Sequence, residues 1–211
     1  IKNGTCASTS YLIRCGNETC QAMTELEKYI HTYFSVNKDD LAKISSFFKP
    51  VTLKKGEYFL KTGRHSDRLG FVQTGIIREF IFIDDKEITK WISTKGYFVV
   101  DLSSFMFKIP ARWNIQALTD CELYIINNKD YQRLGQEIPR WMELEKLFIA
   151  KCFTVLEDRI ITHLSMTAEE RYNQLFNFNA SLFNQVPLQY LASMLGITPE
   201  TLSRIRKKAV G

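Results

Sequence analysis

The feature that most restricts the possible fold is a run of short β-rich segments between residues 51 and 127. The stretches "VTLKKGEYFLKTG", "RLGFVQTGIIREFIFIDDKEITKWIS" and "NIQALTDCELYIIN" are rich in β-branched and aromatic residues. Short strands at this spacing, separated by glycine turns, are typical of an antiparallel barrel or sandwich. We therefore expect a compact β domain, with one helical turn at "DLSSFMFK". The expected turn positions are Gly56, Gly63, Asp84-Asp85, Gly75 and Gly96.

Helical periodicity precedes and follows this β domain. Apolar residues at helical spacing over residues 24–48 predict two short helices, broken near Ser35–Asn37. The segment "IPRWMELEKLFIAKCFTVLEDRIITHL" predicts one long helix that is apolar on more than one side. One side can cover the β domain and the other can meet a second copy of the chain. A wholly intramolecular helix is the alternative. We assign the dimer seam to Trp141, Leu144, Phe148, Cys152 and Val155.

The last part of the chain predicts further helices with clear boundaries. Thr167 and Glu170 form a capping-box pattern, so a helix should begin there. A second helix should start near Pro187 and end at Gly196. The stretch "LGITPETLSRIRKK" then reads as a turn and a capped basic helix, with Thr198 as the N-cap. A small residue, a glycine turn and a capped helix are the pattern of a helix-turn-helix.

The final helix carries residue types that suit a DNA major groove. Arginine can donate two hydrogen bonds to guanine, and glutamate can accept one from cytosine. Lysine and threonine suit phosphates, which fix position without reading sequence. A solvated basic helix end is the alternative, since cations in a last turn also favour the helix dipole. The predicted DNA-binding residues are Thr198, Pro199, Glu200, Thr201, Ser203, Arg204, Lys207 and Lys208.

Composition is compatible with this interpretation and excludes several others. The 211 residues are 45% hydrophobic and 24% charged, which suits one large globular domain or two small ones. The formal charge of +5 permits a polyanionic partner. The chain shows no membrane-length apolar run and no secretion signal, so we expect a cytoplasmic protein. Its three histidines lack metal spacing, and nucleotide-binding glycine motifs and nucleophile motifs are absent. We therefore expect that the protein is not an enzyme and that it has no metal site.

The order of β-roll, long helix and helix-turn-helix resembles the Crp/Fnr family of bacterial transcription regulators. The resemblance covers about Glu25 to Lys208 and is strongest in "LASMLGITPETLSRIRKK". There the family shows a small residue, a glycine and then Ser/Thr-x-Glu-Thr-x-x-Arg, positions held here by Thr198, Glu200, Thr201 and Arg204. Pro199 departs from the Arg or polar residue usual at that place. The residues of these stretches are similar to those of the family branch common in Bacteroidetes-type bacteria.

The resemblance implies an α+β fold: a jelly-roll β domain like a cyclic nucleotide-binding domain, a long dimerisation helix and a winged-helix-like helix-turn-helix domain. It also implies a homodimer on a two-fold symmetric stretch of double-stranded DNA. We further expect RNA polymerase as a partner and no membrane association. The expected division is a disordered tail or misassigned start at 1–22, an effector-sensing β-roll at 23–135, a dimerisation helix at 136–165 and a DNA-binding domain at 166–211.

Family members that bind cyclic AMP carry a Gly-Glu-Leu segment, a short helix and then Arg-Ser/Thr-Ala. In the matching stretch of this chain, Val100 replaces the glycine, Asp101 replaces the glutamate, and Trp113 follows Arg112. We therefore expect no cyclic nucleotide cofactor. Asp101 is also a natural helix cap, and Arg112 reads equally as a surface residue. A different small effector, or none, remains open. The candidate effector residues are Asp101, Leu102, Ser103, Arg112 and Trp113.

The cysteines suggest an alternative. The oxygen-sensing branch of the family holds an iron–sulfur cluster with three N-terminal cysteines and one in the β domain, and this chain has Cys6, Cys15, Cys20 and Cys121. The N-terminal spacing is too loose to preorganise a cluster, and a thiol in a strand is usually structural. An iron–sulfur regulator therefore stays an alternative to the Crp/Fnr-type DNA-binding regulator. Another is an effector-binding module whose helix-turn-helix does not read DNA.

Overall fold

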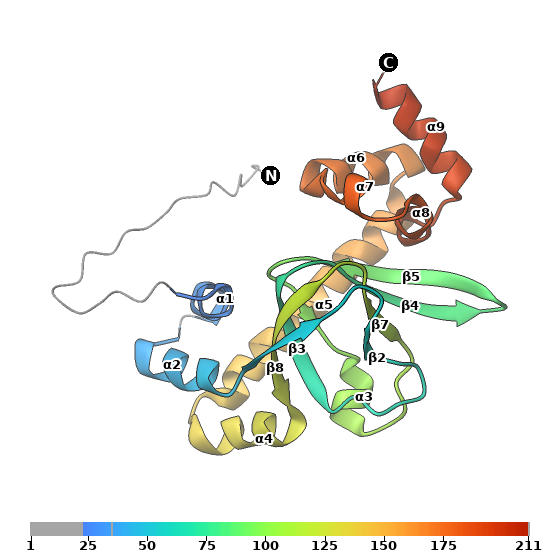
Figure 1. Ribbon diagram of the computed structural model, residues 1–211. Helices are drawn as coiled ribbons and strands as arrows, with labels where there is room; N and C mark the ends of the chain where they lie inside the picture. Colours follow the sequence, from blue (N-terminus) through green and yellow to red (C-terminus); the bar gives the residue numbers. More distant parts are fainter. Residues whose placement is uncertain (1–22, 35, 211) are drawn as a thin grey trace.

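The computed structural model describes residues 23–34 and 36–210, and its centre is a β-roll of two packed sheets (Figure 1). All strand pairings among the named strands are antiparallel. One sheet has the order β1-β8-β3-β6, with β1 (Lys49–Leu53), β8 (Cys121–Asn127), β3 (Arg68–Thr74) and β6 (Phe98–Val99). The other has the order β2-β7-β4-β5, with β2 (Tyr58–Leu60), β7 (Asn114–Ala117), β4 (Ile77–Ile83) and β5 (Lys86–Ser93). The predicted β domain is confirmed.

The turns of the roll follow from local chemistry. Asp84 and Asp85 both have positive φ, at 47° and 61°, and they join β4 to β5 in a two-residue hairpin turn. Aspartate tolerates this left-handed conformation better than most residues, and such turns match the twist of the strands. Gly75 has a φ of +93°, and a Cβ there would lie 2.5 Å from the Cys121 sulfur. Only glycine fits this position.

Helices α1 (Glu25–Phe34), α2 (Lys38–Ser46), α4 (Asn128–Glu137) and the first part of α5 (Trp141–Ser165) cover one end of the roll. The Asn37 side chain caps α2 by accepting a hydrogen bond from the backbone of Asp40. The predicted break between the two N-terminal helices is therefore confirmed. Helix α3 (Leu102–Phe107) is the predicted helical turn inside the β domain, capped by Asp101.

The C-terminal part consists of α6 (Ala168–Asn179), α7 (Leu182–Gln185), α8 (Leu188–Leu195) and α9 (Pro199–Val210). The capping box at Thr167 and Glu170 is confirmed, since each side chain bonds the other residue's backbone N–H. Two β-domain residues, Ile76 and Ile92, belong to the same buried cluster as these helices. Figure 1 shows α5 running behind the roll and ending beneath them.

No strands of the expected wing are found among the described residues, and the winged-helix character stays a prediction. Between Met166 and Val210, the part of this region that the structure describes, all regular structure is helical. A wing needs paired strands, and the described residues beyond α5 supply none. The described region is therefore a compact group of helices around an apolar core that it shares with Ile76 and Ile92 of the β domain.

Candidate functional site

Helices α8 and α9, the terminal helix pair, are joined by a tight turn at Gly196. Gly196 adopts the left-handed conformation with a φ of 68°, and its N–H bonds the carbonyls of Ala192 and Ser193. The Ile197 N–H bonds the Ala192 carbonyl at 3.0 Å. This is a glycine-ended helix whose last carbonyls are satisfied locally. The Thr198 hydroxyl then accepts a hydrogen bond from the Thr201 N–H at 3.2 Å, which starts α9.

The terminal helix pair buries the apolar side that its spacing predicts. Leu191, Ala192 and Leu202 are 0% exposed, and Leu195 and Ile205 are nearly so. Ala192 is small enough to let the two helices approach closely. The remaining face of α9 is left to solvent and, together with its cap Thr198, carries the eight predicted DNA-binding residues. Six are exposed and two half-buried; the latter are Thr201 and Ser203.

The charges on that face are not equivalent. The Lys208 ammonium lies 3.1 and 3.0 Å from the two carboxylate oxygens of Glu169 on α6. Within the described residues, Arg204 and Lys207 make no ion pair. Hydrogen bonds from the backbone N–H of Glu200 and from Thr198 lower the pKa of the Glu200 carboxyl, which therefore stays ionised at the start of α9. Arg204 and Lys207 are thus the cations with uncompensated charge.

Helix α8 contacts the β domain through strand β5, which sequence reasoning missed. The Ser193 hydroxyl accepts a hydrogen bond from the Thr89 N–H at 2.8 Å and donates to the Glu87 carbonyl at 3.3 Å. A side chain of α8 thereby satisfies backbone groups at the open edge of the sheet. We call this junction the α8–β5 contact.

Arg78 is the central side chain of the α8–β5 contact. It is 1% exposed, and its guanidinium lies 2.5 Å from a Glu87 carboxylate oxygen and 2.9 Å from the Thr89 hydroxyl. Its guanidinium carbon lies 4.2 Å from the ring centre of Phe80 and 3.5 Å from that of Tyr190 on α8. A buried cation between two aromatic rings binds both by cation–π attraction. The only sequence signal was an Arg-Glu pair in an otherwise apolar strand.

The residues predicted to hold an effector are brought together at α3. Asp101 is 3% exposed. Its carboxylate accepts hydrogen bonds from the backbone N–H groups of Ser104, Arg112 and Trp113, at 3.0, 2.8 and 3.3 Å. Asp101 therefore acts as a cap and cross-link, which was the alternative interpretation of this residue. The Arg112 side chain is exposed, whereas Leu102 and Ser103 are half-buried.

An ion pair lies beside Trp113. The Lys90 ammonium is 2.6 Å from a carboxylate oxygen of Glu79, which is 5% exposed. The same ammonium lies 4.9 Å from the centre of the Trp113 ring. The space next to the α3 segment is therefore occupied by an ion pair and an indole that stabilise each other.

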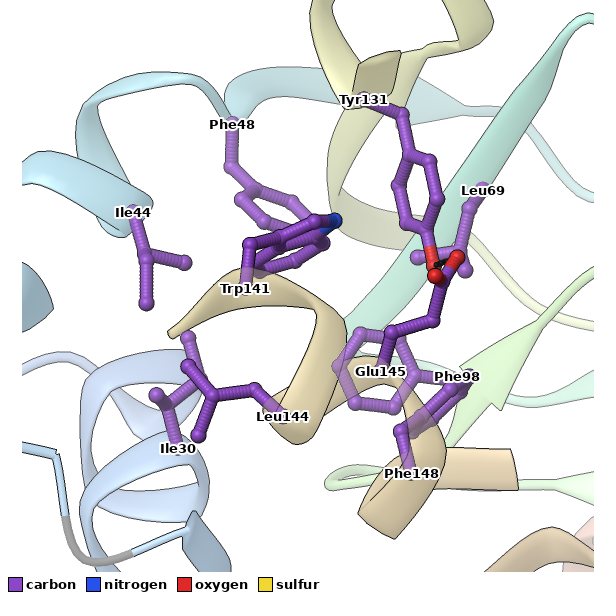
Figure 2. A pocket seen from close by; sticks show the side chains of 10 residues that line it. All are labelled: Ile30, Ile44, Phe48, Leu69, Phe98, Tyr131, Trp141, Leu144, Glu145 and Phe148. Carbon is purple, nitrogen blue, oxygen red and sulfur yellow. Dashed lines mark hydrogen bonds between the residues drawn. The ribbon is translucent and has the colours of Figure 1, made fainter. Parts of the chain in front are cut away.

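The predicted dimer-seam residues of α5 differ in their exposure. Figure 2 shows Trp141, Leu144 and Phe148 among side chains of α1, α2 and the roll, lining a small apolar cleft. Leu144 is 5% exposed, and the Phe148 ring meets the Phe98 ring edge-on at a centroid distance of 5.0 Å. Leu144 is buried within the chain and Trp141 and Phe148 are half-buried there, so these three residues offer little surface to a second copy. Cys152 and Val155 are exposed.

A different face of α5 carries exposed apolar side chains. Phe153 is 59% exposed, and Leu164 is 82% exposed. Several of these positions recur at intervals of three and four residues, the spacing of a coiled-coil seam. We call this set the outer face of α5: Met142, Ile149, Phe153, Leu156, Ile160 and Leu164.

The cysteine alternative receives no support from the described residues. Cys6, Cys15 and Cys20 lie outside them. Cys121 is 2% exposed, burial raises the pKa of its thiol, and its sulfur lies 3.5 Å from the Ile76 carbonyl. Residues 23–34 and 36–210 hold no group of three or more His, Cys, Asp or Glu side chains placed to bind a metal ion. The same residues include no helix both long and apolar enough to cross a bilayer.

Comparison with known proteins defines the class of the β domain. Residues 50–137 match the family model of the cyclic nucleotide-binding domain, which covers β1 to α4. The β-roll is therefore similar to a cyclic nucleotide-binding domain, and the chain as a whole is a mixed α+β protein with helices following the roll.

Solved structures of three bacterial proteins share this fold. The c-di-GMP-responsive global regulator CLP of Xanthomonas campestris matches with a TM-score of 0.64 and 17% identity, over 82% of this chain and 91% of that one. FixK2 of Bradyrhizobium japonicum matches with a TM-score of 0.62 and 15% identity, over 76% and 83%. The catabolite activator protein of Thermus thermophilus matches with a TM-score of 0.53 and 19% identity, over 84% and 85%. A search of curated proteins finds no match.

Proposed function

We propose that this protein is a DNA-binding transcriptional regulator of the Crp/Fnr type. The observation that carries the proposal is the terminal helix pair. Its apolar sides are buried against each other across a glycine turn, and the polar face of α9 is left exposed. This is the geometry of a helix-turn-helix whose second helix enters the major groove. The fold shared with three bacterial regulators supports the same conclusion.

The exposed residues of α9 divide into base-reading and phosphate-binding roles. Arg204 follows Glu200 by one helical turn and carries an unpaired charge, so its planar guanidinium suits a guanine edge. Lys207 suits a phosphate. Lys208 must first leave Glu169, which lowers its contribution below that of a free lysine.

The protein acts as a homodimer through the outer face of α5. An exposed apolar stripe on one helix is stabilised when a second copy covers it. Two copies related by a two-fold axis present two α9 helices to half-sites about one turn of DNA apart. Contact with RNA polymerase and a cytoplasmic location stay predictions.

The β domain does not use a cyclic nucleotide as its effector. The backbone N–H groups of Arg112 and Trp113 already donate hydrogen bonds to the Asp101 carboxylate. They are therefore not free to donate to an anionic ligand at α3. The Glu79–Lys90 ion pair and the Trp113 ring occupy the adjoining space. A nucleotide would have to break these interactions before making its own.

The test is selection of bound duplexes from a random pool, followed by titration of the selected and a random duplex. Arg204→Ala should weaken specific binding by about 1–3 kcal/mol and relax one position per half-site. Lys207→Ala should weaken both duplexes alike and reduce the salt dependence by about one ion. Arg133→Ala, at an exposed arginine on α4, is the control. No enriched sequence, or equal losses on both duplexes for Arg204→Ala, would refute the assignment.

A further inference from the structure

A large cleft lies where the β domain, α5 and the C-terminal helices meet. Its volume is about 310 Å³. Ligand pockets are usually of several hundred cubic ångströms and often lie between domains. We call it the junction cleft. Its walls come from β5 and the following turn, from the second half of α5, and from α6 and α8.

The walls of the junction cleft are mainly apolar. Trp91 lines it from β5, Leu175 and Phe178 from α6, and Met194 from α8. Phe178 is 68% exposed, which is unusual for a phenylalanine unless something covers it. These surfaces suit the hydrocarbon or aromatic body of a small molecule.

Two arginines in the same cleft lack an acidic partner. Arg159 donates to the carbonyls of Lys90 and Met194, and it stacks 5.0 Å above the Trp91 ring. Arg171 donates to the carbonyls of Leu195 and Met166, at 3.0 and 2.7 Å.

Within the described part of the chain, neither guanidinium forms an ion pair with a carboxylate. Asp158 also lines the cleft, and Glu79 lies near Arg159 but is paired with Lys90. Burial lowers the pKa of Arg159, against the opposing influence of Glu79. Carbonyl dipoles orient both guanidiniums but leave two full positive charges, so the cleft is complementary to an anion.

We propose that the junction cleft binds an amphipathic organic anion, a carboxylate or sulfonate carried on an aliphatic or aromatic body. The apolar walls take the body, and Arg159 and Arg171 take the acidic group. A planar guanidinium donates to two oxygens of such a group at once, which gives direction as well as strength. The site is separate from the Asp101 segment, and none of the α3 residues lines it.

A ligand in the junction cleft would affect the positions of the elements that form its walls. The ligand would touch β5, α5, α6 and α8 together, and Arg159 already links β5 to α8 through hydrogen bonds. This regulatory part rests on the proposed DNA-binding function. The binding of the anion itself does not.

The experiment is fluorescence titration with 8-anilinonaphthalene-1-sulfonate, an aromatic anion, followed by displacement with dodecanoate. One probe should bind per chain. Dodecanoate should displace it, whereas dodecyltrimethylammonium, a cation with the same chain length, should not. Arg171→Gln should weaken probe and dodecanoate binding about tenfold or more, and Arg171→Lys should restore part of it. Leu175→Trp should block binding by filling the cleft while both arginines are kept.

Two controls locate the binding. Arg133→Gln removes an exposed, ion-paired arginine elsewhere, and Phe153→Ser removes an exposed phenylalanine from the outer face of α5. Both should bind as the wild type does, with melting curves confirming that every variant is folded. Unchanged binding in Arg171→Gln and Leu175→Trp, or equal displacement by the cation, would overturn the proposal. Normal anion binding without any change in DNA affinity would instead refute only the regulatory link.

Discussion

In the proposed dimer, the seam could lie on either of two faces of α5, and one substitution distinguishes them. Phe153 is 59% exposed on the outer face of α5. Burying a large apolar side chain completely is worth about 1.5–3 kcal/mol, so covering the exposed part of Phe153 is worth about 1–2 kcal/mol in each copy. Phe153→Glu loses this twice and places two carboxylates in an apolar seam. The combined cost of about 5 kcal/mol raises the dimer dissociation constant by more than about a thousandfold.

Sedimentation equilibrium at micromolar concentration measures this directly. Phe153→Glu should be a folded monomer with a normal melting curve, because the ring has little to lose inside the chain. Phe148→Ala is the matched comparison, since the Phe148 ring packs on Phe98 within the chain. It should remain a dimer but lose about 2 kcal/mol of unfolding free energy. A Phe153→Glu dimer, or a folded Phe148→Ala monomer, would return the seam to the opposite face.

Four further substitutions test the packing of the β domain. Arg78→Met should lower the free energy of unfolding by about 2 kcal/mol, because it removes the cation–π contacts and strands a partly exposed Glu87; an unchanged urea midpoint would contradict this. Gly75→Ala should cost more than about 3 kcal/mol because its Cβ would overlap Cys121, whereas Gly56→Ala, at a similar φ with open space around it, should cost about 1 kcal/mol. Asp101→Ala should cost about 3 kcal/mol in a thermal melt by leaving buried N–H groups unpaired, and a loss below 1 kcal/mol would show that water replaces the carboxylate.

The elements that the sequence predicted correctly are those fixed by local chemistry. The Asp84-Asp85 turn, the Thr167–Glu170 capping box and the Gly196 turn each depend on residues within a few positions of one another. Such contacts form between residues close in sequence and do not depend on the tertiary fold, so residue spacing alone is enough to predict them. The position of the terminal helix pair followed for the same reason.

Sequence reasoning was insufficient where contacts between distant parts of the chain decide which of two similar side-chain patterns is buried or paired. Helix α5 has two apolar sides, and periodicity cannot say which one meets the β domain. The structure places Leu144 inside and leaves Phe153 outside. Lys208 read as a free cation because Glu169, 39 positions away in sequence, is brought to it only by the packing of α6 on α9. Arg78 was missed because Tyr190 lies on another domain.

The α8–β5 contact shows how the β domain can hold the C-terminal helices without covering the polar face of α9. Ser193 and Tyr190 contact the β domain from α8, while Leu191 and Leu195 of the same helix pack in the C-terminal core. Helix α8 therefore uses separate faces for the two neighbours, and α9 keeps its polar face in solvent. Because α8 and α9 share one core, a displacement of β5 against α5 moves them as a unit. The junction cleft lies along that same boundary, which is where a bound anion would bias the position of α9 most directly.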